Sequence, residues 1–358
     1  MLMSFRQSPP ERVCVLRLSA LGDACHVLAV VRRLQDYWPD TRFTWLIGRH
    51  EHRLLSLADD IEFITVDKKA GLRGYRELAR RLAHQRFDLS LHMQLALRAS
   101  LYGMLIKSPV KLGFDRARAR EAQWLFTTDR IAPAPRCHVL DGLLGFATAL
   151  GAPPRPLRWD LQLPAAATEY AERLVPPGTR ALVISPCSSH RARNWSAERY
   201  AAVAEHAVRA HGMSVILAGG PGDVERRMAG AILAHVREPV VDQVGKDTLP
   251  QLLALLGRAT ALVTPDSGPA HMATMAGLPV VGLYAATNPA RSGPYLSRAH
   301  CVDRYAEAAR RFLGREPEDL PWQTKIERPG VMDLIEVGDV TAKLDALLAR
   351  QPPPGPVV

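Results

Sequence analysis

The chain has 358 residues, of which 47% are hydrophobic and 23% charged, a composition typical of a soluble globular protein of about two domains. No apolar run reaches roughly 18 residues and no signal-peptide core follows the first methionine, so a membrane-spanning helix and secretion are disfavoured and a cytoplasmic location is expected. The net charge is +10, and residues 1–160 carry +9 of it, which predicts an anionic partner for that half: nucleic acid, a phosphorylated substrate or a membrane surface.

Strands and helices alternate in the first half of the chain, which predicts a parallel α/β sheet. A helical pattern follows the first strand to about residue 36, and a basic one spans residues 71–86. The expected strands are short apolar runs at residues 13–18, 43–48, 61–66, 89–93 and 110–114.

The basic helical pattern at 71–86 places Arg73, Arg76 and Arg80 on one face, with Leu78 and Leu82 on another. Two interpretations stay open. The arginines form either a solvated outer face or a surface that meets an anionic membrane.

A proline-rich stretch at 151–165 is typical of an interdomain linker, and the α/β pattern then restarts. Two Rossmann-like domains with a cleft between them are therefore expected, at residues 1–160 and 161–335. A terminal helix at 336–350 and a disordered tail at 351–358 complete the prediction. The expected strands of the second domain are residues 181–186, 214–220, 239–245, 261–265 and 279–285.

The loop SALGDACH, residues 19–26, directly follows the first strand, where ligands bind in open α/β sheets. Asp23 is a candidate general base there, because a carboxylate can take a proton from a substrate hydroxyl. Aspartate is also a favoured N-cap of a helix, so a purely capping role remains the alternative. The loop lacks the GxGxxG pattern of a dinucleotide-dependent dehydrogenase.

The loop SPCSSHRARNW, residues 185–195, follows the first strand of the second half. Hydroxyls from Ser188 and Ser189 and positive charge from Arg191 and Arg193 suit a diphosphate. An ordinary polar loop, with Ser196 as the N-cap of the next helix, is the alternative.

Two further loops of the second half carry candidate ligand-binding residues. In LAGGPGDVE, residues 217–225, the glycines allow a ligand to approach the backbone, and Glu225 could accept hydrogen bonds from ribose hydroxyls. In TPDSGPAHMA, residues 264–273, Asp266 could bind sugar hydroxyls, and the helix start at 267–270 could bind an anion. His271 could donate to a phosphate.

The sequence contains no D-x-D motif, no CxxC pair among its five cysteines and no cluster with metal-ligand spacing. We therefore expect no cofactor and no metal site. The charge on a leaving diphosphate would be met by arginine, histidine and helix N-termini rather than by Mg²⁺.

These motifs, in this order, resemble the ADP-heptose:lipopolysaccharide heptosyltransferases of glycosyltransferase family 9, which have the two-domain GT-B fold. The resemblance spans nearly the whole chain, and the ordered set of motifs is specific although no single motif is decisive. The matching segments are RLSALGDACH (17–26), GFDRARARE (113–121), SPCSSHRARNWSAERY (185–200), LAGGPGDVE (217–225), the PDSGPAHMA run from 265 and the closing MDLIEVGDVTAKLDALL.

The resemblance assigns roles to individual residues. Asp23 stands where the family has its proposed general base, and Arg120 matches a basic residue on the acceptor side. Arg193 stands where several members have a lysine, a departure that keeps the charge and changes the geometry. The positions that match donor-binding residues are Ser188, Ser189, Arg193, Glu225, Thr248, Asp266, Ser267, Gly268 and His271.

The implied reaction is inverting, metal-independent transfer of heptose from ADP-heptose to a phosphorylated lipopolysaccharide inner core, with peripheral contact to the inner membrane. A glycosyltransferase with another nucleotide sugar or acceptor is the alternative within this fold. A nucleic-acid-binding protein and a non-catalytic sugar-nucleotide sensor are alternatives of other classes. Low aromatic content, 6%, and the lack of a recognised motif disfavour nucleic acid.

Overall fold

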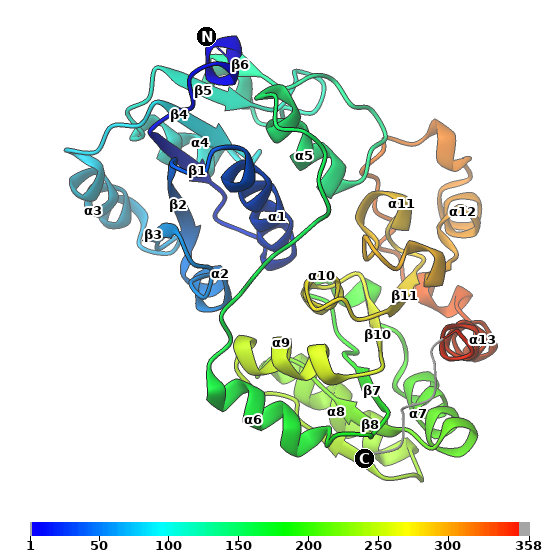
Figure 1. Cartoon of the computed structure of the whole chain (residues 1–358). Helices are drawn as coiled ribbons and strands as arrows, with labels where there is room; N and C mark the ends of the chain where they lie inside the picture. Colours follow the sequence, from blue (N-terminus) through cyan, green and yellow to red (C-terminus); the bar gives the residue numbers. More distant parts are fainter. Residues whose placement is uncertain (1, 351–358) are drawn as a thin grey trace. The chain divides into compact units, whose positions relative to one another are not determined.

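The computed structural model describes residues 2–350, which form two compact units, Met1–Gln162 and Leu163–Val358 (Figure 1). Each unit is built around one six-stranded sheet in which all paired strands run parallel. The expected α/β class with two Rossmann-like sheets is confirmed. The expected terminal helix packs within the second unit, and the predicted tail at 351–358 lies outside the described residues.

The sheet of the first unit has the strand order β3-β2-β1-β4-β5-β6. Its strands are β1 (Arg12–Leu16), β2 (Arg42–Gly48), β3 (Ile61–Val66), β4 (Leu89–His92), β5 (Val110–Gly113) and β6 (Asp129–Arg130). Its helices are α1 (Leu21–Tyr37), α2 (Arg49–Leu55), α3 (Gly71–Leu82), α4 (Leu97–Met104) and α5 (Val139–Ala149), with short 3₁₀ segments at Leu2–Arg6 and Gln123–Leu125.

The inner strands of this sheet are buried because helices cover both faces, which is why they read as apolar runs. Leu78 and Leu82 of α3 and Tyr102 of α4 pack on one face of the sheet, against Leu16 and Leu46. α1 and α5 pack against each other on the other side of the sheet (Figure 1).

The second sheet has the strand order β12-β11-β10-β7-β8-β9. Its strands are β7 (Ala181–Ile184), β8 (Ser214–Leu217), β9 (Val240–Asp242), β10 (Ala261–Pro265), β11 (Val280–Tyr284) and β12 (Val302–Asp303). Its helices are α6 (Ala165–Leu174), α7 (Ala197–His211), α8 (Asp223–His235), α9 (Leu249–Arg258), α10 (Gly268–Met275), α11 (Pro289–Ser292), α12 (Tyr305–Ala308) and α13 (Val337–Leu348). Short 3₁₀ and π turns lie at Arg191–Arg193, Arg298–His300, Ala309–Leu313, Pro317–Asp319 and Val331–Leu334.

Each sheet has one topological switch point, a pair of neighbouring central strands from which the connections run to opposite sides of the sheet. This point lies between β1 and β4 in the first unit and between β7 and β10 in the second. The loops that follow these two strands diverge, and the crevice between them is where open α/β sheets bind ligands. The topology therefore points to the loops after β1, β4, β7 and β10.

The sequence predicted ten of the strands because each is an apolar run, and these predictions are confirmed to within three residues at their ends. It missed the two edge strands β6 and β12, because each has only two residues and no apolar run.

The proline-rich segment expected to be an interdomain linker lies largely along α1, and the boundary between the two units falls within it, after Gln162. Trp159 is buried and its indole Nε1 donates to the carbonyl oxygen of Cys25 at 2.9 Å. The Arg32 guanidinium donates to the carbonyls of Trp159 at 3.3 Å and Asp160 at 2.7 Å. These bonds hold the chain to α1 up to the unit boundary at Gln162.

Trp159→Phe should lower the free energy of unfolding of the first unit by about 1–3 kcal/mol, because the buried carbonyl of Cys25 loses its donor while the ring still packs. Trp124→Phe is the control, since Trp124 is only half-buried and contacts Arg116 through its ring face. Urea unfolding followed by circular dichroism measures both variants. Equal midpoints would contradict the anchoring role of the indole hydrogen bond.

Candidate functional site

Asp23 lies in the first turn of α1, directly beyond the end of β1. Its carboxylate forms an ion pair with Arg17, and the Arg17 side chain also donates to the carbonyl oxygen of Met93, after β4, at 2.5 Å. The capping interpretation of Asp23 is wrong, because Ala20 occupies the N-cap position and Asp23 is directed to Arg17. The Asp23 side chain keeps 33% of its surface exposed, so a ligand could reach the carboxylate.

A chain of amide contacts joins the other loops at this edge of the first sheet. Gln94 Oε1 accepts from the backbone N–H of Leu18 at 2.6 Å, which ties the loop after β4 to the loop after β1. Gln123 Nε2 donates to the carbonyls of His92 and Gln94 at 2.8 and 3.0 Å. The segment after β5, which carries the exposed Arg120, is thereby held to the carboxyl edge on which Asp23 lies.

In the second unit, Ser188 connects the loops on the two sides of the switch point. Its hydroxyl donates to the carbonyl oxygen of Asp266 at 2.9 Å, and its backbone N–H donates to Asn194 Oδ1 at 2.7 Å. The next residue, Ser189, is exposed. The structure thus brings together the serine loop after β7 and the DSG loop after β10, which lie almost 80 residues apart in sequence.

Arg193 is the central cation of this crevice and is almost fully buried, with 8% of its surface exposed. Its guanidinium lies 3.3 Å from Asp266 Oδ2 and 3.0 Å from Glu327 Oε1. Partial burial alone would raise the pKa of Glu327, but the hydrogen bond and charge of Arg193 reverse that effect and lower it. A buried arginine between two carboxylates is held in one orientation.

The start of α10 lies beside this network. Ser267 is the N-cap residue, and its hydroxyl shares a hydrogen bond of 2.9 Å with Thr264, whose own hydroxyl donates to the carbonyl of Ser185 at 2.8 Å. Gly268 begins the helix and His271 lies in its first turn, with part of its surface exposed. Pro269 has no backbone N–H, so of residues 267–270 only Ser267, Gly268 and Ala270 can donate to an anion.

Glu225 lies over the glycine loop that follows β8. A Cβ atom at Gly222 would be 2.4 Å from Glu225 Oε2, so a larger residue there would displace the carboxylate. Because β8 pairs with β7, the glycine loop follows a strand adjacent to the one that leads into the serine loop. Burial, and then the charge of Glu225, raise the pKa of the Cys187 thiol in the serine loop to about 12. The structure therefore groups Glu225 with the serine loop.

Thr248 has a local role in the structure. It is the N-cap of α9. Its hydroxyl accepts from the backbone N–H of Gln251 at 3.4 Å, and the Gln251 side chain accepts from the backbone N–H of Thr248 at 2.9 Å. This capping box explains the position of Thr248 without any ligand.

The neighbouring Asp247 has one carboxylate oxygen that is buried and has no hydrogen-bond partner among the described residues, and burial raises its pKa to about 6.

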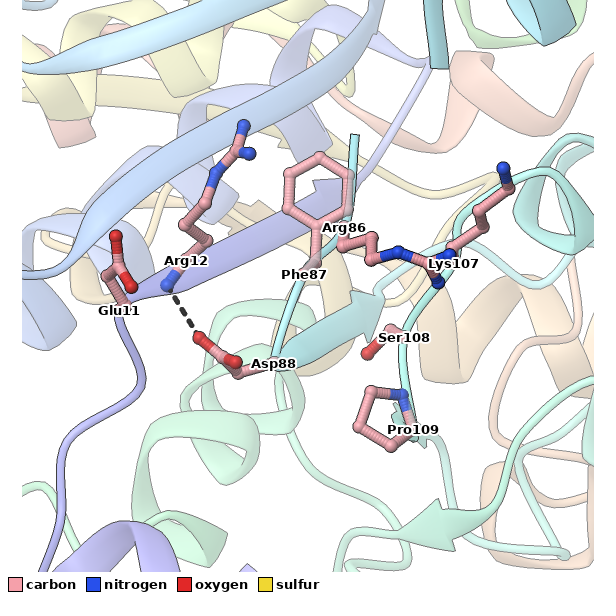
Figure 2. Close-up of a pocket in the computed structure, with 8 residues that line it drawn as sticks. All are labelled: Glu11, Arg12, Arg86, Phe87, Asp88, Lys107, Ser108 and Pro109. Carbon is pink, nitrogen blue, oxygen red and sulfur yellow. Dashed lines mark hydrogen bonds between the residues drawn. The ribbon is translucent and has the colours of Figure 1, made fainter. Parts of the chain in front are cut away.

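A cavity of about 670 Å³ opens at the opposite edge of the first sheet (Figure 2). Arg12, Arg86 and Lys107 line it, and Asp88 Oδ2 accepts from the backbone N–H of Arg12 at 2.9 Å. These residues lie at the amino ends of β1, β4 and β5, far from Asp23 along each strand. Because parallel sheets bind ligands at the carboxyl edge, the cavity is not assigned to the candidate active site.

Sequence reasoning missed three residues that organise these crevices: Arg17, Gln94 and Glu327. Arg17 is the first residue of the RLSALGDACH motif, and its position six residues before Asp23 is the only sequence signal for the pair. Glu327 had no such signal, since it lies 134 residues from Arg193 in a segment without regular structure.

The comparisons with known proteins agree on one family. A family model described as glycosyltransferase family 9 (heptosyltransferase) matches residues 75–319. The chain is 40% identical to the lipopolysaccharide core heptosyltransferase OpsX of Haemophilus influenzae, over 94% of this chain and 97% of that protein. It is 23% identical to lipopolysaccharide heptosyltransferase 3 of Escherichia coli, over 91% and 96% of the two chains.

Solved structures show the same fold at lower identity. A glycosyl transferase family 9 protein from Veillonella parvula has a TM-score of 0.78 at 22% identity, with 95% of this chain and 98% of that chain covered. Escherichia coli heptosyltransferase WaaC, solved with ADP, has a TM-score of 0.72 at 18% identity, with 94% and 99% covered. These likenesses confirm the expected fold class.

Asp247 provides a test of burial in the second unit. Because its pKa is raised from about 4 to about 6, the folded protein binds this proton more tightly than the unfolded chain. The free energy of unfolding should therefore fall as pH rises through that window. Asp247→Asn should be about 1–3 kcal/mol more stable than the parent protein at pH 8, and the difference should shrink toward pH 4.

The control for Asp247→Asn is Asp223→Asn, because the Asp223 side chain is 73% exposed and pairs only with Arg226 at the surface. Urea denaturation at pH 4, 6 and 8 gives the comparison. An Asp247→Asn protein that is no more stable than the parent at pH 8 would show that the carboxylate is solvated.

Proposed function

The chain belongs to glycosyltransferase family 9, the heptosyltransferases, and from this premise we propose that it transfers a heptose from ADP-heptose to the inner core of lipopolysaccharide, on Kdo-lipid A or a heptosyl acceptor. Similarity to a core heptosyltransferase along nearly the full length of both chains supports the reaction class. The observation that carries the proposal is the buried Arg193 network at the switch point of the second sheet.

The donor site in this proposal is the crevice between the loops after β7 and β10. The hydroxyls of Ser188 and Ser189 and the guanidinium of Arg193 bind the diphosphate. Glu225, which lies over the glycine loop, accepts from the ribose hydroxyls. Asp266, Ser267 and Gly268 hold the sugar and phosphate beside the start of α10, and Thr248 stays a weaker candidate because it already caps α9.

Asp23 acts as the general base. It takes the proton of an acceptor hydroxyl while that oxygen forms a bond to the anomeric carbon, and the bond to the ADP oxygen breaks on the opposite face with its electron pair leaving on ADP. Arg17 keeps the carboxylate oriented, because it is itself fixed to the carbonyl of Met93. Attack from the opposite face inverts the anomeric configuration.

The charge that develops on ADP is met by groups of the second unit rather than by a divalent metal. Arg193 supplies a fixed cation, His271 can donate a hydrogen bond or a proton, and the start of α10 supplies backbone N–H groups. A preorganised set of this kind needs little rearrangement as the bond breaks.

The acceptor site is assigned to the basic first unit. Its net charge of +9 over residues 1–160 suits carboxylates and phosphates of an inner-core acceptor. Arg120 is exposed in the segment after β5, and the neighbouring Glu121 accepts from the N–H of Leu97 at 2.5 Å, at the start of α4. Arg120 is thereby close to the apolar and basic surface described next.

The surface formed by α3 and α4 is the proposed contact with an anionic membrane. Leu72 on α3 is 77% exposed, and Leu97, Leu101 and Met104 form an exposed stripe on α4. The two helices are adjacent, since the rings of Tyr75 and Tyr102 lie 5.9 Å apart.

Exposed arginines flank these apolar side chains. On α3 they are Arg73, Arg76 and Arg80, and on α4 the exposed arginine is Arg98. Apolar side chains flanked by arginines match a bilayer with anionic headgroups.

Within residues 2–350, no helix is long and apolar enough to cross a bilayer. The α3–α4 surface is therefore the feature from which we argue a membrane contact. We propose a cytoplasmic protein that contacts the inner membrane through α3 and α4, where a lipid-linked acceptor would be presented.

A second candidate function is transfer from another nucleotide sugar within the same fold. The observation that favours it is Arg193, which stands where several family members have lysine and which holds two carboxylates at once. A planar, bidentate cation and a flexible point charge impose different geometry on a diphosphate.

Calorimetric titration with ADP, UDP and GDP in the presence of EDTA should show selective binding of ADP. Arg193→Ala should weaken ADP binding by about 10–100-fold, since a charge-assisted contact is lost, while Arg193→Lys should keep most of it. Arg237→Ala, an exposed arginine just after the end of α8, is the control. Selective UDP or GDP binding would replace the donor, and no binding of any of the three would refute the donor site.

Asp23→Asn should lower kcat by at least about 10²-fold, because the proton acceptor is removed, while ADP binding to the second unit stays unchanged. Asp40→Asn, an exposed aspartate just before β2, should leave both quantities unchanged. Turnover is measured by ADP release with ADP-heptose and a lipid acceptor. Full turnover in the Asp23 variant would exclude it as the base and would point to another base, whereas ADP-heptose binding without turnover in the parent protein would point to a non-catalytic sensor.

The membrane contact is tested by sedimentation with vesicles of phosphatidylglycerol and phosphatidylcholine. The double variant Leu72→Ser, Leu101→Ser should bind anionic vesicles at least about tenfold more weakly than the parent, because apolar area no longer enters the interface. Leu233→Ser, an exposed leucine of α8 in the second unit, is the control. Equal binding by both variants would leave the α3–α4 surface as a solvated face.

A further inference from the structure

A cluster of two histidines and an aspartate joins α7 to α13 in the second unit. His206 and His211 lie in the last six residues of α7, and Asp345 lies near the end of α13. The two Nε2 atoms approach the same carboxylate oxygen, Asp345 Oδ1, at 2.7 and 2.6 Å. Each of the three side chains keeps 21–45% of its surface exposed, so the cluster is open to solvent.

We propose that these three residues bind a divalent transition-metal ion, with zinc as the reference case. One ligand atom from each residue lies within 4.8 Å of the other two. In a tetrahedral zinc site with bonds of about 2.0–2.1 Å, neighbouring ligand atoms are about 3.3 Å apart, so the cluster needs a movement of less than about 1.5 Å in any pair. Two imidazoles and one carboxylate favour zinc and its transition-metal neighbours over Mg²⁺ or Ca²⁺.

The electrostatic setting favours a cation at this place. Both helices end within about one turn of the cluster, and the C-terminal end of a helix carries a partial negative charge. Asp345 lies close to the C-terminal end of α13, so its negative carboxylate is repelled by the partial negative charge of that helix end. Two hydrogen bonds from histidine, or an ion, offset that repulsion.

The ion would act on the architecture rather than on the transfer reaction. α7 begins four residues after Arg193 and runs for 15 residues, so the cluster at its far end lies about 20 Å along the helix from the candidate donor site. Its ligands come from helices that are 134 residues apart in sequence. Coordination would therefore fasten α13 to α7, and the inference does not depend on the proposed function.

No short sequence motif reveals this cluster, and the expectation of no metal site stays a prediction, which the titration below tests against this proposal. Metal-binding motifs are recognised by short spacings along the chain, whereas the aspartate here is supplied by the distant helix α13. His206 and His211 are five residues apart on α7, a spacing without a familiar metal motif.

The test is zinc titration of the untagged full chain, stripped with EDTA and desalted, by isothermal calorimetry. The parent protein should bind one equivalent, and His206→Gln, His211→Gln and Asp345→Asn should each bind at least tenfold more weakly. His235→Gln is the matched control, because His235 forms a two-residue pair with Glu198 at 3.2 Å and should not contribute. Zinc should raise the Tm of the parent and of His235→Gln, and not that of Asp345→Asn.

Unchanged zinc affinity in all three ligand variants, or no binding by the parent, would overturn the proposal. The Tm of each variant without zinc shows whether it folds. The visible spectrum of Co²⁺ bound to the parent protein provides a second measurement that requires no variant. Nitrogen and oxygen ligation without a thiolate charge-transfer band supports the cluster, whereas a thiolate band would place the ion on cysteine and overturn it.

Discussion

The structure depends most on how each sheet holds together the two loops that diverge from its centre. In a parallel sheet, the ends of the two central strands are left with backbone groups that no neighbouring strand can satisfy. Side chains satisfy them here: Arg17 and Gln94 in the first unit, Ser188 and Thr264 in the second. Each connects one side of the switch point to the other, so the two diverging loops are held together by the protein's own side chains.

Charge is distributed differently in the two crevices. In the first, one ion pair between Arg17 and Asp23 leaves the carboxylate partly exposed. In the second, Arg193 is enclosed by Asp266 and Glu327, so a buried cation is compensated on two sides. Removing either carboxylate would still leave Arg193 one ion-pair partner, but part of its donor capacity would be unpaired in a largely buried position.

Much of the fold could be predicted from sequence, because buried parallel strands are apolar runs bounded by turn residues, as at 181–184 and 261–265. The loop residues Asp23, Ser188 and Asp266 could be selected because they directly follow such strands. Partners such as Glu327 and Asp345 could not, because their proximity is created by tertiary packing over more than 130 residues. The capping role of Thr248 is visible in the sequence, because Gln251 stands three residues later in the pattern of a capping box.

The position of α13 has a consequence for the order in which the protein is made. Every element of the first unit's sheet is encoded before Gln162, and Trp159 completes its packing, so this unit can fold during synthesis. The core of the second unit includes Val340, Leu344 and Leu347 of α13, and it stays incomplete until that helix has been synthesised, on the order of 10 s or more later. During that interval the apolar side of α7 lacks its partner, so the incomplete second unit exposes apolar surface and would need a chaperone. Pulse proteolysis of stalled chains of increasing length would reveal this order of folding.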